Sequence, residues 1–177
     1  MAVLNQIRRS VRGCAGRTLA PLTILGLLVA EVIVGGCAPA TSTPPPASWT
    51  PVKGSRFVFY VPPDMKRLAV KPDEGDSEPG ACQSNRIALR YEYGLWPDPL
   101  TEIDKPDLHR AMEFIDGRYA RIVWFHNPRS GHPFDHAIAV HFPTTSEPGN
   151  KLTLFVTCQD PADYETVRLI FRTVRFK

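Results

Sequence analysis

The sequence predicts an α+β domain in which a mainly antiparallel β-meander of five or six strands packs against a C-terminal helix. Several segments alternate apolar with polar residues, which is typical of strands with one buried face. The dipeptide Asp116-Gly117 is typical of a two-residue hairpin turn. Near the C-terminus, apolar residues instead recur at helical spacing.

Four segments carry the strand prediction. Residues 56–62 (RFVFYVP) and 86–94 (RIALRYEYG) alternate most clearly. Residues 136–142 (HAIAVHF) and 151–158 (KLTLFVTC) are rich in apolar and β-branched residues. The turn-rich stretch PTTSEPGN separates this second pair, so we expect the pair to be neighbours along the chain.

The Asp116-Gly117 turn predicts a hairpin that pairs residues 111–115 with residues 118–125. The alternative is a short helix over residues 107–115, because the apolar residues of that stretch also fit helical spacing. We favour the hairpin.

The C-terminal helix is expected from about residue 161 to 174. Asp160 can cap its first turn, and Pro161 suits the first helical position. Its apolar stripe consists of Tyr164, Val167, Ile170, Phe171 and Val174. This stripe predicts that the helix lies across one face of the sheet.

The chain divides into three parts, which are a leader (residues 1–36), a tether (37–51) and a globular domain (52–177). The 177-residue chain has a net charge of +3, from 21 basic and 18 acidic residues. Four arginines and one glutamate lie in the first 36 residues, so the rest of the chain is neutral. A neutral domain argues against nucleic acid as a partner, since that binding depends on neutralised phosphates.

The leader has the order of a secretory signal, with a basic segment, an apolar run over residues 19–34 and then small residues. The apolar run is shorter than the roughly 20 residues that span a bilayer. Val34-Gly35-Gly36-Cys37 resembles the lipobox of bacterial lipoproteins. The resemblance implies that Cys37 becomes the first mature residue and carries a diacylglyceryl group, with its amine usually acylated too. Two or more acyl chains give stable membrane anchoring.

The tether is rich in proline, serine and threonine and predicts an extended spacer between lipid and domain. We therefore expect a protein of the cell envelope that is held by its N-terminal lipid. In the lipoprotein family, the alanine after Cys37 favours the outer membrane, facing the periplasm, if the organism has two membranes. Trp49, near the end of the tether, is expected to pack on the edge of the domain.

Two cysteines, Cys82 and Cys158, remain in the domain. An even pair in an exported protein predicts a structural disulfide. A redox or metal-binding pair is the alternative, but the two residues lack CxxC spacing.

No catalytic, metal or cofactor motif is recognised. His126, His132 and His136 lie close together beside Asp135, yet their spacing matches no compact metal site. The stretch YEYGLWPDPL suggests a binding loop at Tyr93, Leu95 and Trp96, because aromatic residues on loops are favoured at binding sites. The alternative is that Trp96 folds back over the open end of the sheet.

The sequence thus favours a non-catalytic binding module for another envelope component, a protein or a glycan. One alternative is an envelope hydrolase or metal-binding enzyme that uses the loop with His126, His132 and His136. A second is an accessory subunit of an envelope assembly or secretion machine.

Overall fold

The computed structural model of the chain describes residues 43–71, 76–128 and 133–177. The predicted lipobox with Cys37, and also His132, lie outside these residues. The described residues form ten strands and one α-helix, so the α+β prediction is confirmed in class, although there are more strands than the five or six expected. No helix in these three ranges is long and apolar enough to cross a membrane.

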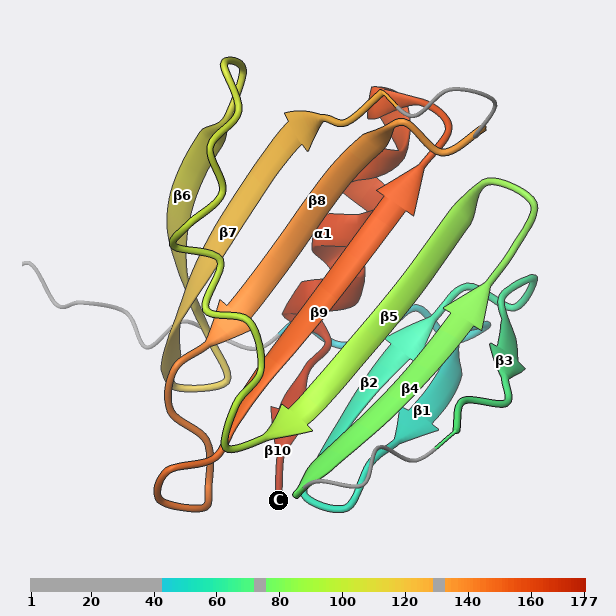
Figure 1. Cartoon of the computed structure of the whole chain (residues 1–177). Coiled ribbons are helices and arrows are strands. Elements are labelled where there is room, and N and C mark those ends of the chain that lie inside the picture. The colour runs from blue at the N-terminus through green and yellow to red at the C-terminus, as the bar shows by residue number, and fades with distance from the viewer. Residues whose placement is uncertain (1–42, 72–75, 129–132) are drawn as a thin grey trace, which may run out of the picture. The chain divides into compact units, whose positions relative to one another are not determined.

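The larger of two sheets has seven antiparallel strands in the order β3-β4-β5-β9-β8-β7-β6 (Figure 1). These strands are β3 (Lys66–Leu68), β4 (Ser77–Gln83), β5 (Ile87–Gly94), β6 (His109–Ile115), β7 (Arg118–His126), β8 (His136–Phe142) and β9 (Lys151–Cys158). The smaller sheet has the order β1-β2-β10 and consists of β1 (Thr50–Lys53), β2 (Phe57–Val61) and β10 (Arg175–Phe176). A 3₁₀ turn, η1 (Pro161–Asp163), leads into α1 (Tyr164–Arg172).

The predicted hairpin between β6 and β7 is confirmed, and the alternative helix over residues 107–115 is wrong. Asp116 and Gly117 have φ angles of 49° and 73°, as a type I′ turn requires at both central residues. The strands β8 and β9 have the predicted bounds.

The core lies between one face of the larger sheet and a second layer made of α1 and the smaller sheet (Figure 1). Its centre is aromatic. Phe57 and Phe59 on β2 pack against Tyr91 of β5, with ring centroids 5.5 Å apart in both pairs. Since all three rings are buried, they join the two sheets through the apolar area that they remove from water.

The smaller sheet begins inside the segment predicted to be a tether, because β1 starts at Thr50. Trp49 packs against the core cluster, as expected. Pro51 is accommodated because β1 is an edge strand, where a missing N–H breaks no ladder.

The C-terminal helix is present but shorter than predicted. Asp160 caps the preceding turn, accepting a hydrogen bond from the Ala162 N–H at 2.7 Å. Val167, Ile170 and Phe171 face the core, and the helix ends at Arg172 because the chain turns there to enter β10. Arg172 donates two hydrogen bonds to the Glu113 carboxylate at 3.0 and 3.1 Å, which ties α1 to β6.

Thr173 joins the end of α1 to the smaller sheet and is completely buried. Its hydroxyl donates a hydrogen bond to the Ile170 carbonyl at 2.6 Å and accepts one from the Tyr60 N–H at 2.9 Å. A single hydroxyl therefore satisfies backbone groups of two elements.

We expect Thr173→Val to lower the free energy of unfolding by about 1–2 kcal/mol, because valine keeps the volume but leaves the Tyr60 N–H without this acceptor. Urea unfolding followed by circular dichroism measures the change. Thr173→Ser is the control, since it keeps the hydroxyl and loses only a methyl group. Equal loss in both variants would assign the effect to packing and contradict the prediction.

The predicted disulfide between Cys82 and Cys158 is wrong for this fold. Both cysteines are free and buried. Cys82 on β4 pairs with Leu89 of β5, and Cys158 on β9 pairs with Ile87 of the same strand, so β5 separates them. Two strand spacings amount to about 9.5 Å, beyond the roughly 7 Å limit for the Cα atoms of a disulfide. Burial raises the pKa of both thiols, that of Cys158 to about 12, so neither is an activated thiolate.

Candidate functional site

The outer face of the larger sheet, opposite α1, is only half covered. The long connection from β5 to β6, residues 95–108, crosses over β7 and β8 (Figure 1). Leu100, from this connection, is buried against Val123 and Ala139 in a second, smaller apolar cluster. Leu100 holds a φ of 58°, so this burial stabilises an uncommon backbone conformation.

Polar contacts fix the same connection to the sheet. The Thr153 hydroxyl donates a hydrogen bond to the Asp98 carbonyl at 2.9 Å, and Arg121 donates one to the Pro99 carbonyl at 2.8 Å. His141 Nδ1 lies 2.8 Å from the same Thr153 oxygen. Because the only hydroxyl proton goes to Asp98, Nδ1 must carry the proton and donate to Thr153.

His141 is 3% exposed beneath the connection. Burial lowers its pKa from 6.5 to about 4, and the positive charges of Arg121 and Lys151 act in the same direction, while Asp98 opposes them. His141 is therefore neutral at neutral pH. It acts as a hydrogen-bond donor within the polar contacts that fix residues 95–108 to the sheet.

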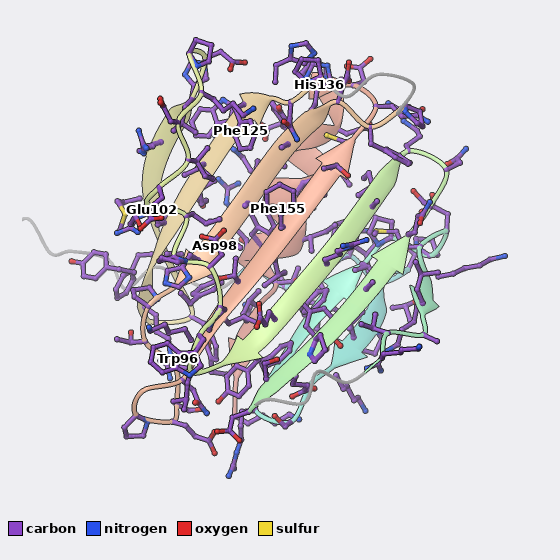
Figure 2. The ribbon with its side chains drawn as sticks, in the orientation of Figure 1. Trp96, Asp98, Glu102, Phe125, His136 and Phe155 are labelled. Atoms are coloured by element: carbon purple, nitrogen blue, oxygen red, sulfur yellow. The ribbon has the colours of Figure 1, made fainter. Side chains whose placement is uncertain are left out.

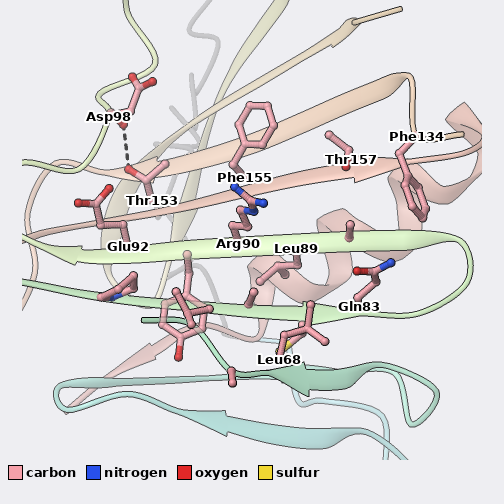
Figure 3. A pocket seen from close by; sticks show the side chains of 18 of the residues that line it. Leu68, Gln83, Leu89, Arg90, Glu92, Asp98, Phe134, Thr153, Phe155 and Thr157 are labelled. Carbon is pink, nitrogen blue, oxygen red and sulfur yellow. Dashed lines mark hydrogen bonds between the residues drawn. The ribbon is translucent and has the colours of Figure 1, made fainter. Parts of the chain in front are cut away.

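The uncovered half of the outer face forms an open groove of about 800 Å³ over β4, β5 and β9 (Figure 3). Arg90 and Glu92 project from β5, and Thr153, Phe155 and Thr157 project from β9. Charged, hydroxyl and aromatic groups thus lie side by side, which suits an extended partner with both polar and apolar surface. We call this feature the β5–β9 groove.

The predicted binding residues fall in different environments. Trp96 is 83% exposed, so the alternative in which it folds back over the sheet end is wrong (Figure 2). Leu95 is also exposed. Tyr93 is only 4% exposed, and its hydroxyl donates a hydrogen bond to Glu147 at 3.0 Å. Tyr93 therefore supports the end of β5 and offers no surface to a partner.

A second group of polar side chains lies at the other end of the sheet. His126, the last residue of β7, and His136, the first of β8, face each other directly in the ladder. Their rings are 5.0 Å apart, and Asp135 places one carboxylate oxygen 3.3 Å from Nε2 of His126 and the other 3.5 Å from Nε2 of His136. The three side chains together are called the His126–Asp135–His136 cluster below. The sequence had placed these residues close together but predicted no metal site from them.

Asp107 extends the cluster. Its carboxylate accepts a hydrogen bond from the His126 N–H at 2.7 Å, and this bond lowers the pKa of Asp107. The pKa of Asp135 is also lowered, chiefly by its hydrogen bond to His126. Both carboxylates are therefore ionised well into the acidic range. Sequence reasoning missed Asp107, which comes from the distant connection between β5 and β6.

Comparison with known proteins gives no family. No protein-family profile matches the sequence, and no curated protein matches it either. Among solved structures, the chain is similar to the solution structure of cyanobacterial PsbP (CyanoP) from Synechocystis sp. PCC 6803. The match has a TM-score of 0.49 and 12% identity, and it covers 81% of this chain and 99% of that one. A likeness of this degree says nothing about what this chain binds.

Proposed function

We propose that the protein is a lipid-anchored lipoprotein of the cell envelope that binds another envelope component, a protein or a glycan, through the β5–β9 groove. The observation that carries the proposal is the uncovered half of the outer sheet face, with Trp96 exposed in the connection that follows β5. Trp96 lies two residues before Asp98, which lines the groove, and an exposed tryptophan is a favourable binding residue because tryptophan is enriched among residues that dominate binding energy.

The anchoring part of the proposal depends on the lipobox-like sequence at Cys37 and the proline-rich segment after it. Lipid at Cys37 would hold the domain near the membrane, and the spacer would leave the groove accessible to a partner. Intact mass of the protein from native membranes tests this part. An unmodified Cys37 within a longer chain would contradict it.

The binding part is tested separately by crosslinking in cells. A photoreactive amino acid in place of Trp96 is expected to capture a partner, and a second one at Arg90 is expected to capture the same partner. Glu165, exposed on α1 on the opposite side of the larger sheet, is the matched control position. Equal crosslinking at Glu165 would overturn the groove as the binding surface, whatever the state of Cys37. No crosslink at Trp96 and Arg90 would exclude a protein partner in the groove.

If the partner is a glycan, protein crosslinks are absent and the purified protein sediments with isolated cell-wall glycan. Arg90→Glu reverses the charge in the groove and is then expected to reduce sedimentation. The groove is also the wrong surface if this variant sediments like the wild type and no crosslink forms.

A further inference from the structure

We infer that the His126–Asp135–His136 cluster is a binding site for a divalent transition-metal ion of the Zn²⁺ class. The three side chains offer two imidazole nitrogens and a carboxylate oxygen that all lie within 4.8 Å of one another. This site is separate from the β5–β9 groove. His126 and His136 follow the same alternation as the core-facing residues of β7 and β8, on the side of the sheet that α1 covers.

The fold brings the two imidazoles together without help from an ion. His126 and His136 are cross-strand partners, and directly opposed side chains of an antiparallel pair lie about 5 Å apart at Cβ. Asn127 and Asp135 continue the pairing by one step, since the Asn127 N–H donates a hydrogen bond to the Asp135 carbonyl at 2.6 Å. The ladder therefore fixes the starting position of all three ligands, which reduces the ordering cost of binding.

The distances within the cluster are long for hydrogen bonds and are compatible with a coordination sphere. Charge-assisted N–H···O bonds are about 2.8 Å long. The two histidine–carboxylate distances are 3.3 and 3.5 Å. Ligands bound to zinc at about 2.0–2.1 Å in tetrahedral geometry are about 3.3 Å apart. Each histidine nitrogen is thus separated from one carboxylate oxygen, Oδ2 for His126 and Oδ1 for His136, by about the edge length of a zinc tetrahedron.

The choice of ligands decides the class of metal. Imidazole nitrogen suits zinc, copper and nickel, whereas magnesium and calcium prefer oxygen ligands throughout. The carboxylates of Asp135 and Asp107 both lie close to His126, and carboxylate groups beside an imidazole are suited to a divalent cation. Asp107 bonds the backbone of His126 and would hold that ligand in place.

The site is open to solvent. The side chains of His126, Asp135 and His136 are 47%, 37% and 23% exposed. Three protein ligands leave at least one position of a zinc ion for water or an outside ligand, as in open zinc sites. The ring of Tyr164, at the start of α1, borders His136 with centroids 6.2 Å apart and shields one side.

Titration calorimetry of the purified full-length chain, stripped with EDTA and supplied with Zn²⁺, tests the inference. We expect one ion per chain, and we expect Asp135→Asn and His136→Ala each to weaken binding at least tenfold. Co²⁺ in place of Zn²⁺ is expected to give visible absorption bands that these variants lose. Retained far-UV circular dichroism confirms that the variants are folded; His126→Ala replaces His136→Ala if the latter is not.

His109→Ala is the matched control. His109 lies on the neighbouring strand β6 and stacks on Trp124 at 5.2 Å, but it offers no atom to the cluster. The zinc affinity of the His109→Ala variant is expected to equal that of the wild type. The inference is overturned if the wild type takes up no zinc, or if the double variant His126→Ala/His136→Ala binds zinc as tightly as the wild type.

Discussion

Gly80→Ala is expected to lower the free energy of unfolding by about 2–3 kcal/mol, because there is no room for a methyl group at this position. A Cβ atom on Gly80 would lie 2.0 Å from the ring of Tyr91, its cross-strand partner. The ring cannot easily move away. It packs edge-on against Phe57 and Phe59, and its hydroxyl accepts a hydrogen bond from Arg67 at 3.2 Å.

Urea denaturation of the wild type and Gly80→Ala measures the loss, and a double-mutant cycle with Tyr91→Leu identifies its cause. A leucine at position 91 removes the ring atoms that the new methyl group meets. The cost of Gly80→Ala should therefore fall below about 1 kcal/mol in that background, since residues in contact do not act additively. An unchanged cost would show that backbone strain, and not the Tyr91 ring, limits the position.

Gly80 also shows why part of the sheet could not be predicted. The strand β4 reads SEPGACQ, with a proline and a glycine at its centre and no alternation of large apolar residues. The strand tolerates Pro79 because β3 pairs only with residues 81–83, which leaves Pro79 on an open edge. It needs Gly80 because a tyrosine ring from β5 occupies the space of a side chain. Both facts depend on tertiary neighbours and leave no periodic pattern in the sequence.

The strands that were predicted correctly can be recognised from their own residues. In β5, Leu89 and Tyr91 alternate with Arg90 and Glu92 because one face is buried and the other is wet. The hairpin turn at Asp116-Gly117 is equally local, since two consecutive positive φ angles favour this dipeptide. Segments whose structure is decided by their own residues were therefore predictable.

The disulfide and the candidate sites depend instead on strand order. Cysteine spacing does not reveal that β5 separates Cys82 from Cys158. Likewise, the polar face of β5 was expected to be wet, but the sequence does not reveal that residues 95–108 cover β7 and β8 and leave Arg90 in a groove. The alternative prediction of a metal-binding loop with His126 and His136 came closer to the structure. His126 and Asp135 flank a short connection whose ends are held together by the pairing of β7 with β8.

A fall in pH from 6.5 to about 4 is expected to destabilise the domain by about 2 kcal/mol through His141 alone. In the folded protein the pKa of this imidazole is about 4, whereas in the unfolded chain it is near 6.5. Over this interval the unfolded chain therefore binds more protons at this imidazole than the folded protein does, so the stability present above pH 6.5 is lost as the pH falls. The full difference between the pKa values of His141 in the folded and unfolded states corresponds to about 3 kcal/mol. Solvent screening of the partly exposed Arg121 and Lys151 reduces this contribution.

The variant His141→Asn isolates this contribution. The asparagine side chain can still donate a hydrogen bond to Thr153 but does not titrate, so its stability should depend less on pH between 7 and 4. Urea midpoints at several pH values give the dependence of stability on pH for each protein, and the difference between the two cancels the contributions of the titrating groups that both proteins share. His141 donates a hydrogen bond to the Thr153 hydroxyl, which in turn donates one to the Asp98 carbonyl in the connection of residues 95–108. Protonation of His141 would therefore place a charge beneath that connection. If stability depended on pH equally in the two proteins, the imidazole would reach solvent in the folded state, and the burial of His141 beneath residues 95–108 would then be wrong.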